Sequence, residues 1–335
     1  MNIQEVLNKY FTESAEISIK QCKKGAINLT YHLIVKINGE KKEFILQKMN
    51  PIFNVSIMRD IDFITNHLKS KKIKTQKVVK TLEEKNFIRD GVSWWRVLTF
   101  IPGRSFNVMT SSSQAREAGK LIGLFHNYLS SSDYKFKFKL PHFHDTAFFM
   151  KKLRSTLTKY KNTDKYIELK VLAKNILISY EGLSKETLLN RRIIHGDLKI
   201  NNILFDKNGG KAIALIDLDT LMRGNIAIEL GDALRSWCMP GGEDVKKVDF
   251  DINIYNKALE GYKTTAKFLT TFEEESIPYG VKLVTLELAA RFVIDAFEES
   301  YFVLDSLRYK TLFEQNKKRA ENQYSFFEKF SNSFS

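Results

Sequence analysis

The sequence predicts an α+β protein of two lobes, with a strand-rich first lobe over residues 1–101 and a mostly helical second lobe over residues 102–335. In the first hundred residues, apolar side chains largely alternate with polar ones, as in half-buried strands. Farther along, apolar positions mostly recur at helical spacing. The dipeptide Pro102-Gly103 lies between the two patterns and favours a turn, so we place a linker at about 99–104.

The first lobe is expected to be a small sheet with one main helix. The stretch "NLTYHLIVKINGEKKEFILQKM" contains two strand-like runs joined by Asn38-Gly39, the strongest short-range signal for a β-hairpin. The following stretch, "NVSIMRDIDFITNHLKS", has apolar residues at helical spacing. Further strands are expected in "KVVKTL", "KNFIRDG" and "SWWRVLTFI".

The second lobe contains helical patterns on both sides of a short strand region. They cover 111–131, a segment near 144–160, 164–183, and the chain from about 250 to its end. Residues 192–222 lie between them and combine short apolar runs with a run of polar side chains. This region is where we expect the chemistry.

The composition fits a folded protein of this size and argues against several partner classes. The chain has 335 residues, 43% of them apolar, and a net charge of +14. Its lysines are scattered and form no basic stripe with interleaved aromatics, so we expect no nucleic-acid partner. No apolar run is long enough to span a bilayer and no apolar leader is visible, so we expect no membrane partner. Cys22 and Cys238 are far apart, which favours free thiols in a cytoplasmic protein.

The motif "HGDLKINNILFD" (195–206) supplies groups that phosphoryl transfer from ATP requires. Such a reaction needs a carboxylate that orients the acceptor hydroxyl and positive charge near the transferred phosphoryl. Asp197 is the candidate base, and Lys199 lies in the same loop, where it can reach a γ-phosphate. We therefore predict that both residues are catalytic.

The same region predicts a magnesium site. Carboxylate and amide oxygens are suitable Mg2+ ligands, and Asn202 follows Asp197 by five residues. A hairpin turning at Gly209-Gly210 would bring "ALIDLDT" back beside it, with Asp217 next to Asn202. Asp219 would point to the same side if the strand continues, and could bind a second metal or hold the first through water. ATP and Mg2+ are the expected cofactors.

The spacing "HGDxxxxN" followed by "IDxD" resembles the aminoglycoside phosphotransferase and choline kinase group, whose members have a bilobal protein-kinase-like fold. Within that group, "FILQKMNPIFN", "GDALR" and "LELAARFVIDAFEESYF" are most similar to the N-acetylhexosamine 1-kinases. Those enzymes phosphorylate the anomeric hydroxyl of the sugar with ATP and magnesium. Only fourteen residues separate Asp217 from Asp232, which leaves no room for the activation loop of a protein kinase.

The resemblance also implies roles for residues outside the central motif. His195 would brace the catalytic loop and Asp232 would receive its backbone N–H groups. The remaining implied contacts are with nucleotide for Gly25, Asn28, Thr99, Phe100 and Ile101, and with substrate for Arg235, Glu287 and Arg291. For Arg235 the other possibility is a pair with a nearby carboxylate. Glu287, Arg291 and Asp295 recur every four residues, so they share one helix face.

Two positions depart from the family pattern. Kinases of this fold carry a lysine on the third strand, and that position falls on Gln47, while Lys48 would face the opposite side. Either Gln47 contacts the phosphates or a local bulge brings Lys48 in. The hexosamine kinases carry a histidine beside the loop glycine where this chain has Ala26, and if that histidine contacts the sugar, the departure favours another sugar.

The sequence therefore predicts an ATP- and magnesium-dependent small-molecule kinase acting on a sugar hydroxyl, foremost the 1-OH of an N-acetylhexosamine. One alternative is an aminoglycoside or choline/amino-alcohol kinase of the same fold, because "FEEES" and "FEESYF" could build an acidic, aromatic pocket. A second alternative is a nucleotide-binding pseudokinase without activity, which Gln47 would favour.

Overall fold

The first lobe is built on an antiparallel sheet, and its central hairpin is the predicted one. The structure, a computed structural model, describes residues 1–22, 27–71, 73–183 and 191–334. In the hairpin, Ile37 pairs with Glu40, and both Asn38 (φ 51°) and Gly39 (φ 81°) have the positive φ of a type I′ turn. The sheet consists of β1 (Glu16–Gln21), β2 (Leu29–Ile37), β3 (Glu40–Met49), β7 (Ser93–Thr99) and β5 (Val78–Val79) in that order, with β6 (Ile88–Asp90) also paired to β7.

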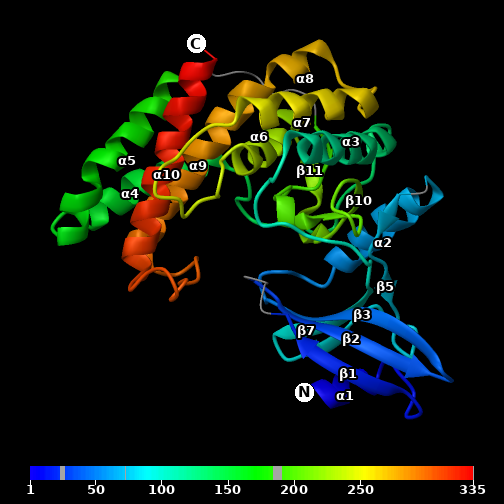
Figure 1. Cartoon of the computed structure of the whole chain (residues 1–335). Coiled ribbons are helices and arrows are strands. Elements are labelled where there is room, and N and C mark those ends of the chain that lie inside the picture. Colours follow the sequence, from blue (N-terminus) through cyan, green and yellow to red (C-terminus); the bar gives the residue numbers. More distant parts are fainter. Residues whose placement is uncertain (23–26, 72, 184–190, 335) are drawn as a thin grey trace.

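One face of this sheet has its own small core. Leu33, Leu46 and Val97 point to that face and are buried against Val6 and Leu7 of the short helix α1 (Ile3–Leu7). The opposite face of the sheet turns toward the second lobe (Figure 1). Side chains at alternate positions of β3 and β7 are therefore presented either to this core or to the cleft.

The predicted helix is α2 (Ile57–Ser70), and the core that it joins includes residues of both lobes, among them Met49 of β3 and Trp94 of β7. Its apolar side chains, such as Ile61 and Ile64, share one hydrophobic core with Ile122 and Leu198. The segment that follows, β4 (Lys74–Thr75), pairs in parallel with β10 (Ala212–Leu215). The lobe boundary at 101/102 stays a prediction, and core contacts cross it at α2 and β4.

The second lobe is a helical layer around the strand region. Its helices are α3 (Ser112–Leu129), α4 (Thr146–Lys159), α5 (Asp164–Gly182), α6 (Ile226–Trp237), α7 (Ile252–Thr265), α8 (Thr271–Glu275), α9 (Ile277–Glu298) and α10 (Leu312–Ser333). Helices α3 and α7 approach so closely that a Cβ on Gly261 would lie 2.0 Å from the Arg116 carbonyl oxygen. Helices α6 and α9 meet in the same manner at Gly231 and Gly280. In the described residues no helix combines the length and apolarity that a membrane span requires.

The strand region forms two small antiparallel pairs, as the sequence predicts for the hairpin. Strand β9 (Ile203–Phe205) pairs with β10, and β8 (Arg192–Ile194) pairs with β11 (Met222–Gly224). Two 3-10 turns, η1 (Ile200–Asn202) and η2 (Leu218–Thr220), lead into β9 and out of β10. The α+β, two-lobed architecture expected from the sequence is confirmed.

Candidate active site

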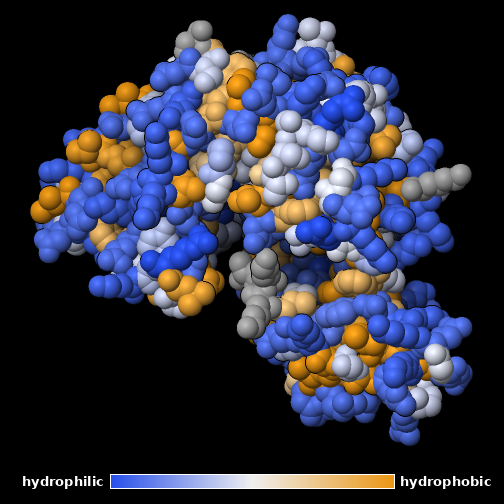
Figure 2. Space-filling view, viewed as in Figure 1, coloured by the Kyte–Doolittle hydropathy of each residue, from blue (hydrophilic) through white to orange (hydrophobic). Residues whose placement is uncertain are grey.

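The catalytic loop begins where β8 ends, and its geometry explains the glycine in "HGD". Gly196 has φ +85°, and a Cβ there would lie 2.6 Å from the Thr220 carbonyl oxygen. Any larger residue would therefore face both backbone strain and a steric clash. The loop lies in the second lobe at the hollow between the two lobes, which Figure 2 shows.

His195 links this loop to the chain that leaves β10 through its ring nitrogens. Its Nε2 donates to the Ile216 carbonyl oxygen (2.9 Å), and its Nδ1 faces the Asp197 backbone N–H (3.3 Å). The ring is therefore engaged on both nitrogens and ties the loop to the chain that leaves β10. Because these bonds use both nitrogens, His195 is not placed to move a proton for the reaction.

The carboxylate that receives the loop N–H groups is Glu229, not Asp232 as predicted. Glu229 on α6 accepts from the backbone N–H of His195 (2.8 Å) and of Gly196 (2.8 Å), and from His126 Nε2 (3.2 Å). Burial opposes its ionisation, but these hydrogen bonds and the nearby imidazoles hold the pKa of Glu229 below its usual value. Asp232 lies one helical turn farther on and pairs with Arg235 instead.

Asp197, Lys199 and Asn202 come together in the loop. Lys199 Nζ lies 2.9 Å from Asp197 Oδ1. Asn202 Nδ2 donates to the Asp197 backbone oxygen (2.8 Å) and to its Oδ2 (3.2 Å). The Asp197 carboxylate raises the pKa of Lys199, so this lysine stays protonated at neutral pH. These contacts leave the Asn202 amide oxygen uninvolved with Asp197.

Asp217 follows β10 in a left-handed conformation (φ 60°, ψ 59°), and Ile216 N–H donates to the Asn202 carbonyl oxygen (2.9 Å). Burial and the charges of Asp219 and Asp197 raise the pKa of Asp217 to about 7. Such convergence of carboxylates favours a cation at this point. The described residues hold no group of three or more His, Cys, Asp or Glu arranged for a metal. Asn202 and Asp217 fit Mg2+ that completes its coordination with phosphates and water.

Asp219 is turned toward the first lobe. Its Oδ2 accepts from Arg96 Nη2 (2.8 Å) and from Asn28 Nδ2 (3.2 Å), and its Oδ1 lies 2.7 Å from Arg96 Nη1. Asn28 also accepts from the Asn50 backbone N–H (2.9 Å). In this state both carboxylate oxygens of Asp219 face the first lobe, so its predicted metal role would require exchange of these partners.

The third strand carries Gln47 where kinases of this fold carry a lysine, and the two predicted alternatives were a phosphate contact by Gln47 or a bulge that brings Lys48 into the cleft. Gln47 faces the cleft, where its Oε1 accepts from Arg96 Nε (2.9 Å) and Nη2 (2.7 Å). Lys48 points to the opposite face and pairs with Asp90 Oδ2 (3.0 Å). The pairing of β3 with β7 shows no bulge here, so the prediction that Lys48 reaches the phosphates is wrong. Strand alternation alone puts its side chain on the wrong face.

The linker residues are largely tied to the first lobe. Thr99 N–H donates to the Lys77 carbonyl oxygen (2.8 Å), and Phe100 N–H donates to that of Glu43 (3.2 Å). Of the three linker residues predicted to meet adenine, only Ile101 has no such backbone bond from its N–H among the described contacts. The predicted contact at Gly25, and the departure at Ala26, lie outside the described residues.

The predicted substrate residues have different surroundings. Arg235 is 2% exposed and donates to Asp232 Oδ1 (2.9 Å) and Glu243 Oε1 (3.2 Å), so the alternative of a carboxylate pair is the one observed. Glu287 is buried and accepts from Thr146 Oγ1 (2.6 Å). Burial raises the pKa of Glu287.

Arg291 does not form an ion pair ladder with its helix neighbours. Its guanidinium packs over the rings of Phe149 (5.1 Å), Tyr301 (5.0 Å) and Phe302 (5.9 Å). Asp295, one turn later, accepts from the backbone N–H groups of residues 300–302 and holds that segment. This face of α9 therefore packs against aromatic rings and the backbone of residues 300–302, and Glu287, Arg291 and Asp295 do not pair with one another along it.

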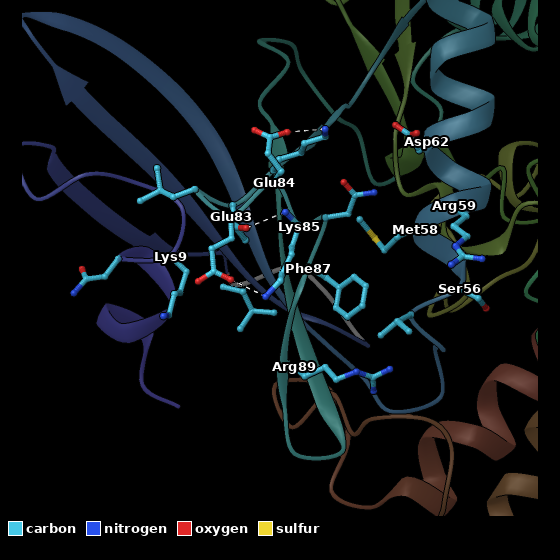
Figure 3. A pocket seen from close by; sticks show the side chains of 17 residues that line it. Lys9, Ser56, Met58, Arg59, Asp62, Glu83, Glu84, Lys85, Phe87 and Arg89 are labelled. Atoms are coloured by element: carbon cyan, nitrogen blue, oxygen red, sulfur yellow. Dashed lines mark hydrogen bonds and ion pairs between the residues drawn. The ribbon is translucent and has the colours of Figure 1, made fainter.

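A cavity of about 1210 Å³ lies elsewhere, on the first lobe between α1, the start of α2 and the segment 80–89 (Figure 3). None of Asp197, Asn202 or Asp217 lines it. Its acidic side chains are partly neutralised locally, because Lys85 pairs with Glu83 (2.6 Å). It is separate from the catalytic constellation.

Two functional candidates were not predicted from the sequence, Glu229 and Arg96. A signal was present for each: an arginine in the middle of the apolar strand "WWRVLT", and a glutamate within the apolar run "IAIELGDAL". Charged residues are rarely fully buried without a partner, so a partner was to be expected for both Glu229 and Arg96. The partners lie far away in the sequence, which is why neither was found.

Comparison with known proteins agrees with this geometry. A model of the phosphotransferase enzyme family matches residues 18–260, which include the whole catalytic region. Three solved structures share the fold: a microcompartment-associated aminopropanol kinase (16% identity, 98% of this chain and 97% of that chain, TM-score 0.67), a choline kinase from Cryptosporidium parvum Iowa II (13%, 99% and 97%, 0.62), and the amicoumacin kinase hAmiN in complex with AMP-PNP, Ca2+ and Ami (17%, 96% and 94%, 0.61). Because the family match spans most of the chain and all of its catalytic loop, the chain belongs to the phosphotransferase enzyme family.

Proposed function

We propose that this phosphotransferase is a small-molecule kinase that transfers the γ-phosphoryl of ATP to a hydroxyl of an uncharged sugar. The 1-OH of an N-acetylhexosamine is the first candidate, from the sequence resemblance. One observation carries the preference for an uncharged acceptor: most acidic side chains near the predicted substrate region already pair with arginine or lysine, namely Asp232, Glu243, Asp244, Glu273, Glu274, Glu298 and Glu299. A cationic acceptor would need carboxylates that are free to pair with it.

The partners are specific. Arg235 neutralises both Asp232 and Glu243. Arg319 holds Asp244 through its Nε (2.6 Å to Oδ1) and Nη2 (2.9 Å to Oδ2). Glu287 is buried and accepts a hydrogen bond from Thr146 Oγ1, and burial raises its pKa. An acceptor bound near these residues and the rings around Arg291 would meet hydrogen-bonding groups and aromatic rings, and few unpaired carboxylates.

The two acidic stretches that favoured a cationic acceptor are also occupied. In "FEEES", Glu273 pairs with Arg192 (2.9 Å) and Glu274 with Lys263 (2.8 Å). In "FEESYF", the two glutamates at 298 and 299 pair with lysines at 152 and 165. Both stretches therefore bridge neighbouring elements of the second lobe, and among their glutamates only the exposed Glu275 lacks a cationic partner in the described contacts.

The proposed mechanism is direct transfer. Asp197 accepts a hydrogen bond from the acceptor hydroxyl and takes its proton as the phosphoryl is transferred. Before transfer, Lys199 moves from Asp197 toward the γ-phosphoryl oxygens, where its charge stabilises the transition state, and ADP leaves as the bond from the γ-phosphorus to the bridging oxygen breaks. Asn202 and Asp217 would hold Mg2+, which when bound neutralises phosphate charge. The Ile101 backbone would meet adenine, as the resemblance implies. The complex of the amicoumacin kinase with AMP-PNP and Ca2+ supports a nucleoside triphosphate and a divalent cation.

A second candidate is an amino-alcohol or aminoglycoside kinase. The names of two structural neighbours, an aminopropanol kinase and a choline kinase, favour it. ADP release with ATP and Mg2+ should be measured across N-acetylhexosamines, unmodified sugars, aminoglycosides and choline. We expect turnover with an N-acetylhexosamine or another uncharged sugar. Turnover confined to the cationic acceptors would replace the proposal by this second candidate.

A further inference from the structure

Arg96 is an arginine at the centre of a buried strand, and it is turned toward the cleft. It lies on β7 with 1% of its surface exposed, directly opposite Gln47 of β3. Its neighbours Trp95 and Val97 point the other way, into the small core of the first lobe. Burying a guanidinium is energetically costly unless it is paired and hydrogen-bonded. The side chain therefore occupies a costly position for which the fold of the first lobe has no evident need.

Its contacts fix it between the lobes. The Gln47 amide oxygen receives both Nε and Nη2, which orients the guanidinium plane. The other side of that plane meets Asp219, the residue two positions after the proposed magnesium ligand Asp217. Arg96 Nη1 and Asp219 Oδ1 lie 2.7 Å apart, yet neither atom has a well-angled hydrogen bond. The contact between Nη1 and Oδ1 is therefore an electrostatic attraction without good hydrogen-bond geometry. Arg96 Nη1 can leave it for an acceptor with better geometry.

The charge at the site shows why another acceptor is expected. Asp197, Asp217 and Asp219 converge here, and the cations that act on Asp217 are Arg96 and Lys199. Lys199 sits on the acceptor side, against Asp197. On the first-lobe side the usual strand lysine is absent, since Gln47 holds its position and Lys48 faces away. Arg96 is thus the cation on that side of the cleft among the residues that surround Asp217.

We propose that Arg96 binds the nucleotide phosphates, with Gln47 as the positioning residue and Asp219 as the counter-ion in the nucleotide-free chain. The planar fork of an arginine suits bidentate binding of phosphate oxygens. When nucleotide phosphates take over the contacts of Arg96, the Asp219 carboxylate would be free to face a divalent cation. This inference rests on the proposed use of ATP.

Binding measurements separate this role from a structural one. Dissociation constants for ADP and for adenosine should be measured by calorimetry, without metal, for the wild type and for Arg96→Ala. We expect ADP to bind about 10- to 100-fold more weakly to the variant, the worth of a charged hydrogen bond, while adenosine binds as before. Lys48→Ala is the matched control, a lysine on the same sheet whose side chain faces away, and its ADP affinity should not change.

Two further variants keep the test independent of folding. Arg96→Gln combined with Asp219→Asn replaces the ion pair by neutral amides, and it should again lose ADP affinity but keep adenosine affinity. Asp219→Asn alone frees Arg96 and should tighten metal-free ADP binding. Equal weakening of ADP and adenosine in the folded double variant, or unchanged ADP affinity, would overturn the inference. Absence of ADP and ATP binding to the wild type would instead overturn the proposed function.

Discussion

Replacing Glu229 by glutamine tests whether one buried carboxylate holds the catalytic loop in place. Glu229 is 1% exposed and receives three donors: the N–H groups of His195 and Gly196 and the ring of His126. Glutamine keeps one acceptor oxygen but turns an N–H group toward these donors. Each hydrogen bond to a charged group contributes about 1.5–3 kcal/mol, so we expect a loss of roughly 2–5 kcal/mol in the free energy of unfolding.

The assay is urea unfolding followed by tryptophan fluorescence at pH 7, with Glu260→Gln as control. Glu260 pairs with Arg116 and Lys257 but is 42% exposed, and such surface pairs contribute about 0–1 kcal/mol. The turnover number should also fall for Glu229→Gln, because Asp197 directly follows the two residues that this carboxylate holds. A loss below about 1 kcal/mol, equal to that of the control, would show that Glu229 does not hold the catalytic loop through these hydrogen bonds.

The pH dependence of the stability difference between wild type and Glu229→Gln tests the same role of Glu229. The folded pKa of Glu229 lies below its usual value of 4.5, so its ionised form is the one the fold favours. Its contribution is therefore fully present above 4.5 and is lost as the pH falls through the folded pKa. The stability gap between wild type and Glu229→Gln should shrink when unfolding is repeated at progressively lower pH. A gap that stays constant or widens would contradict the assignment.

Three other outcomes are expected. Asp197→Ala should reduce turnover by at least about 10²-fold, the usual share of a general base, while ATP binds with nearly wild-type affinity in a calorimetric titration. Asp217→Asn should abolish the gain in ADP affinity on adding Mg2+, yet should not lower the melting temperature, because it relieves repulsion with Asp219 and Asp197. Gly196→Ala should destabilise the fold by about 1–3 kcal/mol through its positive φ, measured by thermal denaturation.

Local patterns predicted much of this fold. Asn38-Gly39 determines its hairpin because both residues tolerate positive φ. The apolar spacing of residues 57–68 indicates a helix whichever part of the protein it packs against. The turn at Gly209-Gly210 brings Asn202 beside the chain that leads to Asp217. These features depend on short stretches of chain, so periodicity and turn chemistry suffice to find them.

Contacts between distant segments were not predictable in this way. Glu229 and Asp232 are one turn apart on α6, and only the packing of that helix decides which of them meets the catalytic loop. The apolar spacing of α2 shows that it buries one face, but not that this face joins the second lobe. Arg96 finds Asp219 across 123 residues, and no local signal connects them.

The preference for an uncharged acceptor is tested most directly by comparing two acceptors that differ mainly in charge. Initial rates of ADP release should be measured with N-acetylglucosamine and with glucosamine, whose amine is protonated at neutral pH, and sugar phosphate should be identified by phosphorus NMR. We predict a sugar phosphate and a higher kcat/KM for the uncharged acceptor. A higher kcat/KM for glucosamine, or ADP release without any sugar phosphate, would contradict it.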